Sequence, residues 1–338
     1  MKRATIADIA RAAGVSKGAV SYALNNRPGV SEATRARILL VAEEFGWHPS
    51  SAARALSDGR AGVLGLIVDR PARTLGIESF FMQLISGIEA TLSASSVGLL
   101  LQVTEDQANE MDAYRRWWGQ RRVDGVIIVD LRQDDPRVAL LEELKLPAIV
   151  IGGPHGLGRL PGVWSDDAAA ITSVVEYLAA LGHRQIARVA GLPMFWHTEV
   201  RTRALAEAVT ALGLADVTTI HTDYSGEEGA RATRSLLAQR RPPTAVIYDN
   251  DVMAVAGVAV AHEMGISVPR QLSIIAWDDS PLCQLVHPQL TAVGRDIAAY
   301  GSHAAESLLE LVMGRPVHSY QDATPRLVPR GSTAPPPG

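Results

Sequence analysis

Carboxylates, an arginine and aromatic rings follow closely on short runs of Val, Ile and Leu in this sequence. If those runs are parallel strands, their carboxyl ends meet at the edge of a sheet where open α/β sheets bind ligands. Aromatic rings stack on C–H faces, and carboxylates and guanidinium groups take neighbouring hydroxyls in pairs. The set therefore predicts a site for a polyhydroxylated small molecule, a mono- or oligosaccharide. Its candidate residues are Asp69, Phe80, Phe81, Asp130, Asp166, Trp196, Arg201, Asn250, Asp251, Trp277 and Asp278.

Some of these residues have purely structural interpretations. Asp166 and Asp278 suit helix N-caps, and Phe81 and Trp277 suit a hydrophobic core. A nucleobase or another small metabolite also remains open as the ligand. We give Arg201 and Asp251 the most weight as ligand contacts.

Motifs of common enzyme classes are missing from the sequence. There is no Gly-x-Ser-x-Gly elbow, no phosphate loop ending in Gly-Lys-Ser/Thr and no dinucleotide glycine fingerprint after a strand. The nine His residues are scattered without metal-ligand spacing, so we predict no metal site and no cofactor. The single cysteine, Cys283, is predicted to be a core residue in a reducing compartment.

Charge divides the chain into a basic head and an acidic body. Residues 1–60 carry nine Lys and Arg against five Asp and Glu, whereas the remainder carries 23 against 31, within a total of 338 residues and a net charge of -4. This asymmetry favours an anionic partner for the head alone.

Three short helices are predicted in the head. Thr5 with Asp8 forms a capping box for the first helix, Gly14 ends it, and Ser16 caps the second helix. The third begins near Ser31. Buried positions are expected at Ile6, Ile9, Ala10, Ala13, Ala19, Val20, Ala23, Leu24, Ile38, Val41, Ala42 and Phe45.

Two short helices joined at a tight turn and braced by a third are typical of a helix-turn-helix unit, whose second helix enters the major groove of DNA. The outward face of the second helix would then place Lys17 and Tyr22 at base edges, with Gly18 allowing close approach. Ser16, Ser21 and Asn25 would hold phosphates. A plain three-helix module with a polar surface is the alternative.

The stretch "HPSSAARALSDGRAG" predicts a short helix over residues 49–56, ended by Gly59. About two helical turns are marginal in isolation, so this helix needs a partner to persist. A flexible linker is the alternative interpretation.

The segment "TIADIARAAGVSKGAVSYALNNRPGVSEATRARILLVAEEFGWHPSSAARAL" resembles the DNA-binding headpiece and hinge of the LacI-type (lactose repressor) transcription regulators. The resemblance implies that the hinge helix folds in the minor groove, where Leu56 side chains of two subunits wedge a base step open. Many members have Thr and Arg where this chain has Ala19 and Tyr22, so the resemblance does not imply the half-site preference that is common in the family. The residues expected to contact DNA are Thr5, Ser16, Lys17, Gly18, Ser21, Tyr22, Asn25, Ala53, Arg54 and Leu56.

Beyond residue 61, eight apolar runs alternate with helical segments, which predicts parallel sheets covered on both faces. They divide into two groups of four, at about 61–160 and 161–290, and so indicate two similar α/β lobes. The final stretch, "LTAV" through a helix near 296–313 to "PRLVPRG", is expected to cross back to the first lobe. The same resemblance covers this part, as a periplasmic-binding-protein-like core. The predicted organisation is thus a headpiece (1–48), a hinge helix with linker (49–60) and a core (61–338).

Together these features predict a repressor that binds palindromic operator DNA as a homodimer and is switched by a sugar that closes the two lobes. A sugar-processing α/β enzyme with an accessory helical domain, or a plain solute-binding protein, remains the alternative. No heptad-rich tail follows the core, so we expect a dimer. With no export signal and no apolar stretch of membrane-spanning length, a cytoplasmic protein is expected.

Overall fold

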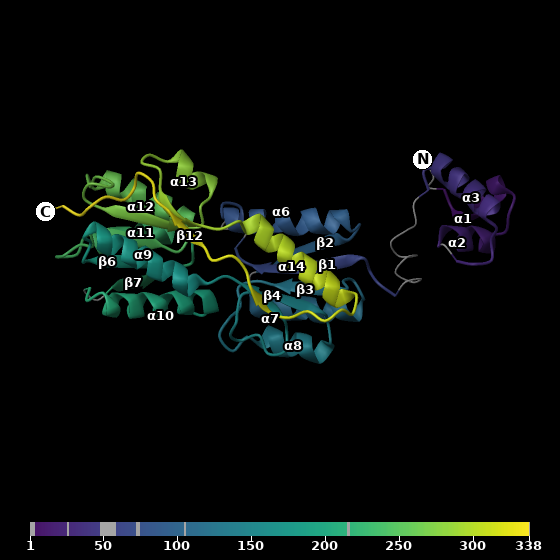
Figure 1. The fold of residues 1–338 in the computed structure, drawn as a ribbon, viewed down its shortest axis with the longest axis horizontal. Helices are drawn as coiled ribbons and strands as arrows, with labels where there is room; N and C mark the ends of the chain where they lie inside the picture. The colour runs from purple at the N-terminus through teal and green to yellow at the C-terminus, as the bar shows by residue number, and fades with distance from the viewer. Residues whose placement is uncertain are drawn as a thin grey trace. The chain divides into compact units, whose positions relative to one another are not determined.

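The computed structural model describes residues 4–25, 27–47, 59–71, 75–104, 106–214 and 217–337. These residues separate into two compact units, 1–61 and 62–338, which we call the headpiece and the body. Figure 1 shows the elements of each. The predicted hinge helix, with Ala53, Arg54 and Leu56, lies outside the described residues.

The headpiece contains three helices, as predicted: α1 (Ile6–Ala13), α2 (Lys17–Leu24) and α3 (Glu32–Glu44). Thr5 caps α1 in a capping box with Asp8, and Gly14 ends this helix in the left-handed conformation at φ 65°. Ser16 and Ser31 cap the next two helices, each accepting a backbone N–H three residues on. The fully buried core of this unit consists of Ile9, Ala10, Ala13, Val20, Ala23, Ile38 and Ala42.

One predicted core residue of the headpiece is wrong. Phe45 is 47% exposed, because α3 ends at Glu44 and the C-cap residue points its ring away from the small three-helix core. Ile6, Val41 and Leu24 are only partly buried at the edge of that core.

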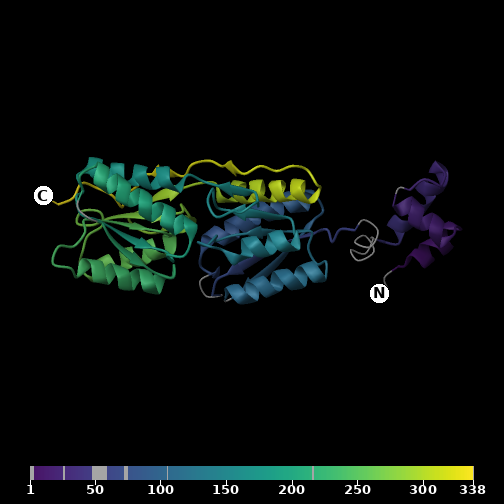
Figure 2. The same cartoon turned by 90° about the horizontal axis from the view of Figure 1, so that it is seen from below.

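The body contains two six-stranded sheets, each flanked by helices on both faces (Figures 1 and 2). The first sheet has the order β11-β5-β4-β3-β1-β2 and the second β12-β10-β9-β8-β6-β7. Every pairing is parallel except that of β10 with β12. The strands are β1 (Val63–Asp69), β2 (Gly98–Thr104), β3 (Gly125–Ile128), β4 (Ala148–Ile151), β5 (Gly162–Trp164), β6 (Ile186–Ala190), β7 (Thr218–His221), β8 (Ala245–Tyr248), β9 (Ser273–Trp277), β10 (Thr291–Gly294), β11 (Tyr320–Gln321) and β12 (Arg326–Val328).

Helices cover the two sheets in pairs. In the first lobe, α6 and α14 share one hydrophobic core with the sheet, and α7 and α8 share another on the opposite face. In the second lobe, α11 and α12 cover one face, and α9 and α10 the other. The helices of the body are α6 (Ser79–Ala94), α7 (Gln107–Gly119), α8 (Pro136–Leu144), α9 (Asp167–Leu181), α10 (Trp196–Ala211), α11 (Gly226–Leu237), α12 (Asp251–Glu263), α13 (Pro281–Leu285) and α14 (Ile297–Val312).

Glycines bring α6 and α14 into direct backbone contact. A Cβ on Gly87 would lie 1.8 Å from the carbonyl oxygen of Ala298, and one on Gly301 would lie 2.3 Å from that of Leu84. No side chain fits at either position. The close approach fixes α14, which follows the second lobe in sequence, firmly on the first lobe.

The eight predicted strands are all present, but the expected path of the final segment was partly wrong. Helix α14 and strand β11 do belong to the first lobe, whereas "LTAV" (β10) and "PRLVPRG" (β12) belong to the second sheet. Strand β5 extends the first sheet beyond the expected boundary at 160. The chain therefore passes between the lobes three times, after β5, β10 and β11, because α14 and β11 complete the first lobe before β12 returns to the second.

Cys283 is fully buried in the second lobe, as predicted, and burial raises the pKa of its thiol to about 12. No helix among the described residues is long and apolar enough to cross a lipid bilayer.

Candidate functional site

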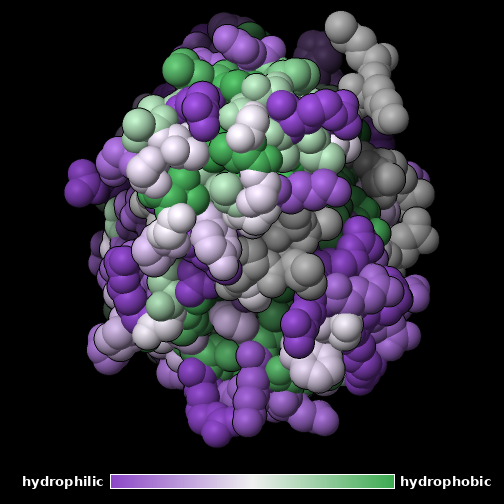
Figure 3. Space-filling model, turned by 90° about the vertical axis from the view of Figure 1, so that its right-hand side faces the viewer, coloured by the Kyte–Doolittle hydropathy of each residue, from purple (hydrophilic) through white to green (hydrophobic). Residues whose placement is uncertain are grey.

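Helix α2 presents most of the predicted DNA contacts on one outward face. Lys17, Gly18, Tyr22 and Asn25 are exposed, and Ser21 is half-buried between them. On the face of the molecule in Figure 3, hydrophilic side chains surround and separate the hydrophobic ones. In the structure these polar residues lie together on α2 and its C-cap Asn25, and the buried Val20 and Ala23 anchor the helix from behind.

Neighbouring segments fix this face. The Tyr22 ring packs on Gly29, where an added Cβ would lie 3.3 Å from the ring. Arg35 of α3 donates to the carbonyl of Ala23 at 3.0 Å and to that of Arg27 at 2.8 Å, which ties α3 to the end of α2 and the following loop. Thr5 lies apart at the start of α1, where its hydroxyl donates to Asp8 at 2.6 Å.

A second candidate site is a cavity between the two lobes, enclosing about 860 Å³ of space that is partly open to solvent. Of the eleven predicted contacts, six line it: Phe80, Phe81, Asp130, Trp196, Arg201 and Asp278. The strand-end rule accounts for this, because the carboxyl ends of both sheets face the cavity.

Five predicted contacts take structural roles beside the cavity. Asp166 is the N-cap of α9 and Asn250 that of α12. Asp69 forms an ion pair with Arg132, and Trp277 lies beneath Arg201. Asp251 accepts a hydrogen bond from Ser79 of the first lobe at 3.1 Å.

Arg201 is the best-supported side chain in the cavity. Its guanidinium carbon lies 3.8 Å from the centre of the Trp277 ring, and its Nη2 lies 2.7 Å from Asp167 Oδ2. Although burial opposes ionisation, the charge of Arg201 holds the pKa of Asp167 below its usual value. The pair is therefore charged, oriented and held rigidly against an aromatic plate.

Arg70 forms the second charged centre. Its Nη2 lies 2.9 Å from Asp130, and its guanidinium carbon lies 5.0 Å and 5.3 Å from the ring centres of Phe195 and Tyr224 in the second lobe. Glu78 lies farther away, 3.8 Å from Arg70 Nε. Burial raises the pKa of Glu78 to about 8 against the opposing effect of Arg70, so Glu78 is mainly a neutral hydrogen-bonding group at pH 7.

Two carboxylates reach the cavity through unusual backbone. Asp130 follows β3 and Asp278 follows β9, and their φ angles of 53° and 64° lie in the left-handed region. Such conformations cost free energy in non-glycine residues and are concentrated at functional sites. Burial raises the pKa of Asp278 to about 6, although Arg295 and Arg201 oppose this.

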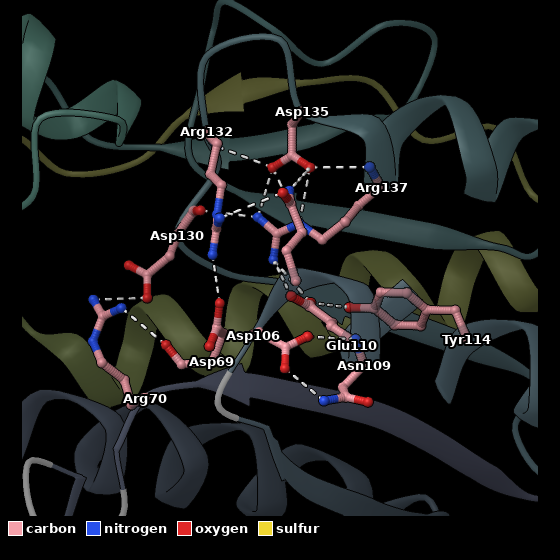
Figure 4. A network of polar contacts seen from close by, with 11 residues as sticks. Asp69, Arg70, Asp106, Asn109, Glu110, Tyr114, Asp130, Arg132, Asp135 and Arg137 are labelled. Atoms are coloured by element: carbon pink, nitrogen blue, oxygen red, sulfur yellow. Dashed lines mark hydrogen bonds and ion pairs between the residues drawn. The ribbon is translucent and has the colours of Figure 1, made fainter. Parts of the chain in front are cut away.

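A polar network shapes the loop that carries Asp130 (Figure 4). The buried Arg137 donates to the backbone carbonyl of Asp130 at 2.9 Å and pairs with Glu110 and Asp135. Asp135 also accepts the backbone N–H of Arg132 at 3.0 Å. The buried ion pairs of Arg137 with Glu110 and Asp135 therefore hold the backbone of Asp130 in its left-handed conformation.

The same loop joins the lobes through its backbone. Gln133 donates to the carbonyl of Met194, and Trp196 donates to that of Leu131, both at 2.9 Å. We call this contact of residues 131–133 with residues 194–196 the interlobe strap. It places Trp196, the first residue of α10, in the cavity.

Polar atoms in the cavity wall are left unpartnered. The indole Nε1 of Trp196 and the Nε of Arg295 are buried without a hydrogen-bond partner among the described residues. Because buried polar atoms are nearly always satisfied, these two atoms of the second lobe are candidate partners for the oxygen atoms of a ligand.

Ten polar or aromatic residues outside the predicted set of contacts also line the cavity: Arg70, Glu78, Trp164, Ser165, Asp167, His197, Tyr224, Asp249, Arg295 and Tyr300. The strand-end pattern of the sequence already indicates three of them, Arg70, Asp167 and His197. Arg295 directly follows β10, so assigning "LTAV" to the second sheet would have found it by the strand-end rule. Tyr224 follows β7 by three residues and accepts or donates a 2.7 Å hydrogen bond with His197. Burial lowers the pKa of His197 to about 4, so this ring is neutral.

The chain is similar to known regulators along its length. The family described as "Bacterial regulatory proteins, lacI family" matches residues 5–50, and "Periplasmic binding protein-like domain" matches residues 175–333. The HTH-type transcriptional regulator MalR of Streptomyces coelicolor is 32% identical over 345 residues, covering 98% of this chain and 97% of the relative.

Two solved structures extend this likeness. A complex of transcriptional regulator CelR with cellobiose is 26% identical with a TM-score of 0.74, covering 98% of this chain and 100% of its own. A lac repressor dimer bound to operator and the anti-inducer ONPF shares the fold, at 24% identity, a TM-score of 0.87 and the same coverage.

Proposed function

Because the chain belongs to the LacI family of bacterial regulatory proteins, we propose that it represses transcription as a homodimer whose operator binding is switched by a sugar between its lobes. The chain is a DNA-binding transcription regulator, and its relatives are regulators, not enzymes. The effector, the dimer and the switch are the proposal.

The observation that carries the sugar assignment is the balance of charge in the cavity. Arg70 pairs with Asp130 and Arg201 with Asp167, so neither guanidinium needs a ligand anion. An uncharged ligand with many hydroxyls can bind both members of each pair without leaving a charge uncompensated. The cellobiose complex of the similar CelR agrees with this ligand class.

Aromatic side chains support the same assignment. Trp196 offers a free N–H, and Trp164 and Phe80 line the same cavity. Such rings stack on the C–H face of a pyranose while the polar groups hold its hydroxyls. A nucleobase would also stack, but its few polar edges would form fewer hydrogen bonds with these charged pairs than the many hydroxyls of a sugar.

The first lobe offers a surface for a second copy. Leu101 and Val103 of the edge strand β2 are 43% and 41% exposed, and Met82 on the adjacent α6 is 60% exposed. An apolar strip beside a sheet edge favours association. Closing the lobes on a ligand would shift the paired first lobes and change the spacing of the two hinge segments, which couples the effector to the operator.

The experiment uses the full chain in two assays. Thermal unfolding is measured against a panel of neutral mono- and disaccharides, with cellobiose and maltose included and free purine bases as the alternative class. We expect at least one sugar to raise the melting temperature and to change the affinity for a duplex selected from random sequence. A response to purines alone would contradict the sugar assignment, and unchanged DNA affinity after deletion of residues 1–60 would contradict the role of the headpiece.

A further inference from the structure

Arginines cluster at the edge of the first sheet where its strands begin. Arg116 lies in the last turn of α7, and Arg121 and Arg122 lie in the turn that leads from α7 into β3. All three side chains are exposed. Arg121 has a φ of 50°, so the chain reverses tightly here and presents the two adjacent guanidinium groups at the edge.

None of these three guanidinium groups forms a hydrogen bond or ion pair within the part of the chain that the structure describes. Trp118 lies among them and is 49% exposed, whereas its neighbour Trp117 is buried against Gly65. The residues beyond 60 carry 31 acidic against 23 basic side chains. An unpaired basic and aromatic surface on an acidic body fits a polyanion.

This edge is also where the chain enters the body from the headpiece. The backbone N–H of Gly62 donates to Asp124 Oδ2 at 2.7 Å, and the N–H of Asp124 donates to the carbonyl of Val63 at 2.8 Å. The arginine turn therefore adjoins the entry point. Even a fully extended connector from Trp47 to Gly62 spans no more than about 50 Å, and a helical one about 20 Å.

We propose that Arg116, Arg121 and Arg122 contact phosphates of the DNA that flanks the operator while the headpiece holds the operator itself. This inference rests on the proposed operator binding and adds a second, sequence-independent contact from the body. The connector keeps the bound DNA near this edge, so a weak electrostatic contact acts at a high effective concentration. Trp118 offers an aromatic surface beside the same phosphates.

The second lobe supplies a matched control. Arg240 and Arg241 occupy the corresponding turn between α11 and β8, and both are exposed. Because the two sheets meet at the carboxyl ends of their strands, this turn lies at the opposite end of the body. R240Q/R241Q removes the same charge as R121Q/R122Q but from an edge that the connector does not enter.

The test uses the full chain and an operator that the wild-type protein selects from a random duplex pool. Duplexes of about 20 and about 40 base pairs contain the operator without and with flanks. Affinity is measured by fluorescence anisotropy over a series of salt concentrations. We expect R121Q/R122Q to bind the longer duplex at least about 10-fold more weakly. Because the homodimer loses four arginines and each phosphate contact contributes about 0.9, the salt slope should fall by about 4.

On the shorter duplex R121Q/R122Q should equal the wild type, and R240Q/R241Q should equal it on both duplexes. The inference is overturned if R121Q/R122Q binds the longer duplex like the wild type, if it weakens both duplexes equally, or if R240Q/R241Q shows the same loss. If the wild type selects no sequence at all, the proposed function fails and this inference fails with it.

Discussion

At the scale of single residues, the cavity separates charged pairs from neutral polar groups. The charges of Arg201 and Asp167 compensate each other. Glu78 instead holds a proton at pH 7, because burial raises its pKa to about 8 and the attraction to Arg70, 3.8 Å away, only partly opposes this rise. The hydroxyl groups of a ligand would therefore find both charged and neutral hydrogen-bond partners. Substitutions of Arg201 and Glu78 test one partner of each kind.

Replacing Arg201 with alanine should lower effector affinity by more than about 30-fold, because a buried, charge-assisted contact is lost. DNA binding should persist, since Arg201 belongs to the body alone. Effector titration by calorimetry and operator binding by anisotropy measure the two properties. Arg203→Ala removes an exposed arginine from the same helix and should change neither. An R201A variant that responds at normal effector concentrations would remove Arg201 from the site.

Glu78→Gln should change how stability depends on pH. Burial raises the pKa of Glu78 from 4.5 to about 8 in the folded chain, so its contribution is complete below pH 4.5 and is lost as pH rises through 8. The wild type should therefore lose about 3 to 5 kcal/mol relative to E78Q across that range. Urea unfolding at several pH values measures the difference.

Glu207→Gln, which removes an exposed carboxyl group on α10, provides the baseline for that comparison. Parallel pH profiles for the wild type and E78Q would show that folding does not raise the pKa of Glu78.

At the scale of elements, the starts of α6 and α12 face each other across the lobes through Ser79 and Asp251. We expect this hydrogen bond to stabilise the closed form, so S79A and D251A should each weaken effector binding by roughly 10-fold. The double variant should be no weaker than D251A alone, because D251A already removes the hydrogen bond that S79A removes, together with the contacts of Asp251 to Ser280 and Val252. If D251A alone abolishes binding while S79A is neutral, Asp251 contacts the effector directly, as the sequence analysis expected.

Local signals predicted the elements well, and their failures have identifiable causes. The caps Thr5, Ser16 and Ser31 act over three residues, so sequence spacing is sufficient to place the headpiece helices. Strand β12 joins the second sheet only through its pairing with β10, and strand β5 has just three residues. Such partners are decided by long-range packing that no local pattern encodes.

The sequence also predicted the candidate site only in part. Asp130 and Asp278 lie at strand ends, where the topology rule places ligand contacts, and they line the cavity. Asp166 and Asn250 lie at strand ends too, but each caps a helix. An acidic or amide side chain serves both purposes equally well, so only the direction in which the backbone leaves the strand distinguishes them.

At the scale of the whole molecule, headpiece and body have separate cores, and a short connector joins them. Because the cavity belongs to the body and α2 to the headpiece, we expect the effector to influence DNA binding through the connector or through the edge that adjoins it. The short helix that the sequence predicts over residues 49–56 would suit this purpose, since about two helical turns are marginal and a small change in spacing would be sufficient to form or dissolve them.

Leu56 is the residue in that connector whose removal tests this coupling. In the proposed complex, two Leu56 side chains open a base step, and the cost of unstacking is offset by contacts that only the operator geometry permits. Leu56→Ala should therefore weaken operator binding by about 100-fold while leaving binding to an unrelated duplex nearly unchanged. Anisotropy on both duplexes measures the ratio, with Leu212→Ala, a 43% exposed leucine of the body, as the control. Equal losses on both duplexes would mean that Leu56 supports the connector without entering the groove.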